Sequence, residues 1–140
     1  MADLEDNIQQ IKETITQAFP KPPGLKEKSS ANALKDRLDW GEPALTIIDV
    51  RDREAFNCER ITGAMSMPLD ELVEQVRDSL EPVRDIYVYG ETDQQTAEAA
   101  SCLREAGFRN VAELEGGLPG WKAISGPTEG QGFNAAFSDQ

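Results

Sequence analysis

Histidine is absent from this chain of 140 residues. Without imidazole there is no Ser-His-Asp or Cys-His nucleophile, no histidine acid or base, and no histidine ligand for a metal. Cysteine is also scarce: Cys58 and Cys102 lie 44 positions apart, a spacing that matches no zinc-binding pattern. We therefore expect free thiols, no metal site and no disulfide.

Basic residues are too few to attract polyanions. The chain has 14 Lys and Arg against 26 Asp and Glu, a formal net charge of -12, which argues against nucleic-acid binding and against docking on anionic lipid. No apolar run approaches the roughly 20 residues that span a bilayer. The first fifteen residues lack the basic region of a secretory signal, so the sequence predicts a cytoplasmic protein with no membrane contact.

The length predicts one domain with added ends. Residues 1–24 read as an amphipathic helix over 2–19, followed by a proline-rich linker. The residues on its apolar stripe are Leu4, Ile8, Ile11 and Ile15. This stripe fits either packing on the domain itself or docking to a partner. Residues 25–126 form the expected domain, and residues 127–140, rich in Gly, Gln, Ser and Asn, are expected to be a flexible tail.

Strand and helix patterns alternate through the domain. Apolar, β-branched runs predict strands at 44–50, 61–67, 85–89 and 111–114. Helical patterns occupy 30–40, 53–57, 71–80 and 94–106, and a short helix begins near Pro119. This alternation predicts an α/β fold of three layers, with a mostly parallel sheet of about five strands between helices.

Parallel sheets of this kind bind ligands beyond the carboxyl ends of their strands. Three predicted loops lie there: residues 49–52, 90–95 and 115–120. The middle loop joins a strand to a helix, so its N–H groups would point towards an anion or a thiolate at the positive end of the helix dipole.

Five sequence pieces occur in an order and spacing that resemble the rhodanese-like domain family over residues 28–125. They are Ile48-Asp49-Val50-Arg51, Ile61-Thr62-Gly63-Ala64 before Met67-Pro68, Tyr87-Val88-Tyr89, Ala106-Gly107-Phe108, and Leu114-Glu115-Gly116-Gly117 followed by Trp121. The resemblance implies the three-layer α/β/α rhodanese-like fold.

The resemblance also implies where a catalytic cysteine would stand. In active members this cysteine opens a six-residue loop and carries a persulfide, and an arginine or threonine usually closes the loop. Here the matching positions are Gly90 and Gln95, and Asp93 replaces a frequent glycine. The complete loop, Gly90, Glu91, Thr92, Asp93, Gln94 and Gln95, contains neither a thiol nor a cation. We therefore expect no catalytic residue, no cofactor and no enzyme activity.

The leading hypothesis is a catalytically inactive rhodanese-like module that acts through protein contact or regulation; the sequence names no partner and no oligomeric state. One alternative is a weak sulfurtransferase or sulfur carrier that uses Cys58. Another is a small-anion sensor built on residues 90–95. We expect Thr92 or Asp93 to cap the following helix. The backbone N–H groups of residues 90–95 would form a cradle for an anion, and we expect a carboxylate of the protein to fill it. Asp49 and Arg51 are expected to form a structural pair or loop hydrogen bonds.

Overall fold

A computed structural model describes residues 26–41 and 44–131. Its centre is a parallel sheet in the order β1-β6-β5-β2-β4. The strands are β1 (Lys28–Ser29), β2 (Leu45–Asp49), β4 (Met65–Ser66), β5 (Asp85–Tyr89) and β6 (Val111–Leu114). This confirms the α/β prediction. The predicted helix and linker over residues 1–24 lie outside the described residues.

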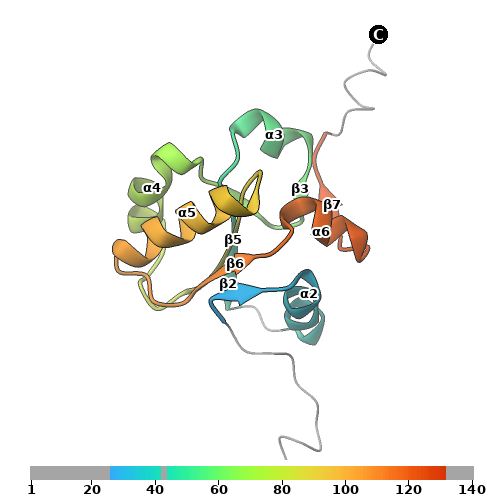
Figure 1. Cartoon of the computed structure of the whole chain (residues 1–140), viewed down its shortest axis with the longest axis horizontal. Coiled ribbons are helices and arrows are strands. Elements are labelled where there is room, and N and C mark those ends of the chain that lie inside the picture. Colours follow the sequence, from blue (N-terminus) through green and yellow to red (C-terminus); the bar gives the residue numbers. More distant parts are fainter. Residues whose placement is uncertain (1–25, 42–43, 132–140) are drawn as a thin grey trace, which may run out of the picture.

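Helices cover both faces of the sheet (Figure 1). α4 (Leu72–Ser79), which follows the 3-10 turn η1 (Leu69–Glu71), and α5 (Asp93–Glu105) pack on one face. α2 (Ala31–Trp40) and α6 (Gly117–Ala123) pack on the other, and α3 (Arg53–Cys58) follows the carboxyl end of β2. None of the helices within 26–41 and 44–131 is long and apolar enough to cross a membrane.

Local side chains fix where the helices begin. The side chains of Ser30, Asp52 and Thr92 each accept a hydrogen bond from a backbone N–H three residues later, so each is an N-cap. α5 consequently starts at Asp93, one residue before the predicted start. Gly41, with φ of 89°, ends α2 in the left-handed conformation that glycine adopts without strain.

Alternation along the strands divides the core in two. Alternate strand residues face α4 and α5 and form an apolar cluster, with Ile48, Ile86, Val88 and Val111 from the sheet and Val50 just after β2. Residues of the other parity face α2 and α6 and include Ile47, Tyr87, Tyr89, Ala112 and Leu114. Both sides of the central strands are therefore buried, as near-continuous apolar runs predict.

The predicted strand over 61–67 is wrong as a single element. Its two ends belong to different sheets: β3 (Arg60–Ile61) pairs with β7 (Thr128–Glu129), whereas β4 pairs with β2. Gly63, with φ of 86°, turns the chain between them. The glycine inside the apolar run was the local signal for this break.

The prediction of a loose chain after Gly126 is wrong for the first residues of that segment. β7 pairs antiparallel with β3, and the indole N–H of Trp121 donates to the carbonyl oxygen of Pro127 at 2.8 Å. A two-residue strand leaves no periodic pattern in the sequence, because its order comes from distant partners.

Candidate functional site

Asp49 and Arg51 form a tight ion pair at the carboxyl end of β2. The Asp49 carboxylate is fully buried and accepts from the backbone N–H of Arg51 at 2.9 Å and from the guanidinium at 2.7 to 3.1 Å. Nη2 of Arg51 also donates to the carbonyl oxygen of Glu59 at 2.6 Å. The predicted pairing of Asp49 with Arg51 is confirmed.

This pair alters the protonation of its surroundings. Burial works against the charge of Arg51, but the hydrogen bond and charge of Asp49 outweigh it, so the pKa of the guanidinium is raised. Burial, with the charge of Asp49 adding to it, raises the pKa of the Tyr89 phenol above its usual range. Tyr89 therefore stays neutral, and its oxygen accepts the backbone N–H of Ile61 at 3.1 Å.

The loop after β5 satisfies its own N–H groups. The N–H of Gly90 donates to the hydroxyl of Thr96 at 2.8 Å, and the N–H of Glu91 donates to Oε1 of Gln95 at 2.6 Å. The N–H of Gln95 donates in turn to the hydroxyl of Thr92, which confirms the predicted Thr92 cap. These contacts use the donors that an anion bound at this loop would need.

Gln95 folds back over Gly90. An ideal Cβ built on Gly90 would lie 2.6 Å from Oε1 of Gln95, so the amide group occupies the space that a side chain at position 90 would enter. The prediction that a carboxylate fills this cradle is wrong, because a neutral amide oxygen fills it. The nearest candidate, Asp93, instead accepts the N–H of Gly116 at 3.0 Å.

The predicted loop residues divide between two sides of the molecule. Gly90, Glu91 and Gln95 face the cleft that Arg51 also lines. Asp93 and Gln94 line a separate hollow beside β1 and β6. The helical turn separates them, because successive residues of α5 point in different directions.

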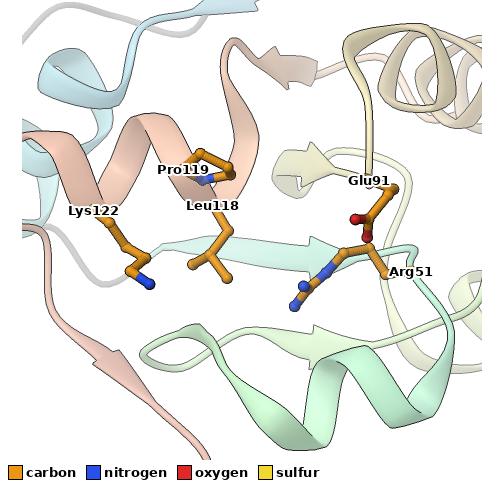
Figure 2. A pocket seen from close by; sticks show the side chains of 6 residues that line it. Arg51, Glu91, Leu118, Pro119 and Lys122 are labelled. Atoms are coloured by element: carbon orange, nitrogen blue, oxygen red, sulfur yellow. The ribbon is translucent and has the colours of Figure 1, made fainter. Parts of the chain in front are cut away.

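Two adjoining hollows make up the cleft. One, of about 330 Å³, is lined by Arg51, Gly90, Glu91, Leu118, Pro119 and Lys122. In Figure 2 the charged tips of Arg51 and Lys122 point into this space from either side of Leu118. The second, of about 670 Å³, shares Arg51, Glu91 and Leu118 and extends along α3 to Cys58 and Glu59. Both cysteines are partly exposed. Cys102 lies on α5 and lines neither hollow.

Glu59 and Lys122 also line the cleft, although no pattern in the sequence indicates that they pair. Nζ of Lys122 donates to Glu59 Oε1 at 2.8 Å, and the hydroxyl of Thr128 donates to Oε2 at 3.1 Å. The hydrogen bond from Lys122, opposed by partial burial and supported by Thr128, lowers the pKa of Glu59. The partners lie 63 residues apart, so only the fold brings them together.

The sequence profile of the Rhodanese-like domain family matches residues 30–124. The chain belongs to the rhodanese-like domain family. The crystal structure of the Alr3790 protein from Anabaena sp. is 55% identical, with a TM-score of 0.72, over 79% of this chain and 98% of that one. A solution structure of its rhodanese-like domain is 57% identical, with a TM-score of 0.74, over 76% of this chain and 80% of that one.

One relative of this rhodanese-like domain is named for sulfur chemistry. The putative sulfur carrier protein YrkF of Bacillus subtilis is 31% identical over 100 residues, which is 71% of this chain and 51% of that protein. The chain thus spans about half the length of this relative, and the same holds for protein slr1261 of Synechocystis, 33% identical over 87 residues, which is 62% of this chain and 48% of that protein.

Proposed function

We propose that this rhodanese-like domain is a non-catalytic module that acts in the cytoplasm through contact with a protein partner. The observation that carries the proposal is the pairing of Gly90 with Gln95. Gly90 stands where the family resemblance places the persulfide-bearing cysteine, and the Gln95 amide fills the space above it. Neither of the chain's two thiols lies in the loop.

The electrostatics of the cleft support the same proposal. Sulfur transfer needs a thiolate with a depressed pKa and room for an anionic donor such as thiosulfate. Here Glu91 lines the cleft, and the loop N–H groups of Gly90 and Glu91 already have neutral acceptors. These contacts also weigh against the small-anion sensor, because an anion would have to displace Gln95.

A thiosulfate:cyanide sulfurtransferase assay on the full chain tests the proposal. We expect turnover at the buffer rate in the parent and in a Cys102→Ser control. Turnover above buffer that survives replacement of both cysteines would overturn the assignment of Gly90 as the position of the missing nucleophile.

Cys58 carries a second candidate function, that of a sulfur carrier. The supporting observation is its place in the same hollow as Glu91 and Gln95. The matched test compares Cys58→Ser with Cys102→Ser after incubation with a persulfide donor. Persulfide detected by mass spectrometry on the parent and lost only with Cys58→Ser would favour this function over the non-catalytic module.

A further inference from the structure

The cationic side chains around the cleft have carboxylate partners, whereas some of its carboxylates have no cationic partner among the described residues. Its two cations each have a carboxylate partner: Arg51 lies 2.7 Å from Asp49, and Lys122 lies 2.8 Å from Glu59. By contrast, the carboxylates of Glu54 and Glu91 form no ion pair or hydrogen bond within the described part of the chain. Glu91 acts on Arg51 only through its charge. The cleft rim is therefore negative.

One solvent-accessible donor also lies at this space without an acceptor among the described residues. The side chain of Arg51 is only 10% exposed, and Nε and Nη2 are held by Asp49 and Glu59. Nη1 has no hydrogen-bond acceptor among residues 26–41 and 44–131, and Arg51 lines the hollow that Figure 2 shows. A donor held this firmly favours an acceptor from a ligand, because its orientation is already fixed.

The two observations together restrict the ligand. An anionic acceptor at Nη1 would be repelled by Glu91, whereas a neutral carbonyl oxygen would not. A cation beside Glu91 and Glu54 would be attracted. Leu118 and Pro119 add apolar side chains to the lining of the same hollow. An extended peptide supplies all three groups: a backbone carbonyl, a cationic side chain and flanking apolar side chains.

We infer that this cleft binds an extended segment of a partner protein that carries a lysine or arginine side chain. The backbone carbonyl accepts from Nη1 of Arg51, and the cationic side chain lies between Glu54 and Glu91. This inference rests on the proposed function as a protein-interaction module and assigns the surface and the chemistry of its partner.

Three capped pentapeptides serve as probes: acetyl-Ala-Leu-Lys-Leu-Ala-amide and the same peptide with glutamate or norleucine in place of lysine. They are titrated into the isotope-labelled full chain at low salt, and binding is followed by NMR. The lysine peptide should bind about fivefold more tightly than the norleucine peptide, as expected from two exposed ion pairs. It should shift the backbone amides of Gly90, Glu91, Leu118 and Lys122 and the Nε–H resonance of Arg51.

Two double variants with the same change in net charge distinguish the effect of the cleft carboxylates from that of the overall charge. Glu54→Gln with Glu91→Gln should abolish the preference for lysine. Glu98→Gln with Glu105→Gln, on exposed positions of α5 outside both hollows, should keep it. Equal loss in both pairs, equal affinity for the three peptides, or no binding would overturn the inference. The sulfurtransferase assay judges the proposed function separately, because it does not depend on peptide binding.

Discussion

One face of the sheet meets α4 and α5 mainly through apolar side chains, with an ion pair between Arg104 of α5 and Glu113 of β6 at its edge. The other face, covered by α2 and α6, carries aromatic rings and the ion pairs Arg37–Asp85 and Arg51–Asp49. On this second face Arg37 stacks on Tyr87 and Arg51 stacks on Tyr89, each with the guanidinium carbon 5.6 Å from the ring centre. The ion pairs lie at opposite ends of the strands, and the cleft lies above only one of them.

The two faces contribute differently: one mainly stabilises the fold, and the other fixes the orientation of polar side chains. Apolar burial stabilises a fold without specifying directions, because the hydrophobic effect depends on area. Hydrogen-bonded ion pairs are directional, and they hold the Arg51 guanidinium at the edge of the cleft. A recognition site needs this fixed geometry, so the polar face carries the candidate site.

The largest expected effect is on the polar face, at Asp49. Asp49→Ala leaves the guanidinium of Arg51 without its buried partner, and breaking such a pair costs about 4 kcal/mol of unfolding free energy. Urea unfolding at pH 7 measures the change. Asp39→Ala, which removes an exposed carboxylate paired with Lys35, is the control and should cost less than about 1 kcal/mol. Equal losses in the two variants would contradict the buried-pair account.

Leu103→Ala tests the apolar face. This side chain is fully buried between α5 and the sheet, so its truncation should cost about 3 kcal/mol. The loss should be independent of salt and pH, because no charge is involved, and the NMR resonances of Arg51 and Gly90 should stay in place. Val83→Ala, at an exposed position, is the matched control. Large changes in the NMR resonances of the cleft residues would show that packing on the apolar face affects the structure of the cleft.

A smaller effect is expected from Gly90→Cys. The new Cβ would lie 2.6 Å from Oε1 of Gln95, so the amide must move and lose its bond to the Glu91 N–H. We expect a cost of about 1–2 kcal/mol. The cost should fall by about 1 kcal/mol when Gly90→Cys is made in a Gln95→Ala background, but not in a Gln94→Ala background. An unchanged cost in both backgrounds would refute the contact.

The smallest effect is expected at Glu59. The pKa of this carboxyl is lowered, with the hydrogen bond from Lys122 as the main cause. Its contribution is therefore present above the unfolded-state pKa and is lost as the pH falls through the folded-state value. Glu59→Gln should cost less than about 1 kcal/mol at pH 7, and the cost should be smaller at pH 3. Urea unfolding at both pH values checks this, and a cost that grows towards acid would contradict it.

Much of the fold followed from local pattern. The strands at 85–89 and 111–114 were confirmed to the residue, because a buried parallel strand needs a continuous apolar run. The N-cap at Thr92, one of the two residues predicted for it, followed from side-chain chemistry that acts over three residues. Strands β1 and β7 were missed, because two residues carry no periodicity.

The candidate site was predicted only in outline. The sequence predicted Asp49 and Arg51 as a pair and marked residues 90–95 as a loop facing the ligand side. The sequence predicted a carboxylate in the anion cradle, whereas the Gln95 amide fills it. The conformation that places this side chain over Gly90 depends on packing, which the spacing of residues along the chain does not reveal. Glu59 and Lys122 had no local signal at all.

The sequence by itself determined the α/β class, the family, the scarcity of thiols and the lack of imidazole chemistry, since these depend on composition and on patterns within a few residues. Only the tertiary structure decided which carboxylates are neutralised. Asp49 and Glu59 each meet a cation, whereas Glu54 and Glu91 meet none among the described residues. Coulomb interactions depend on distance in space, and distance in space is set by the fold.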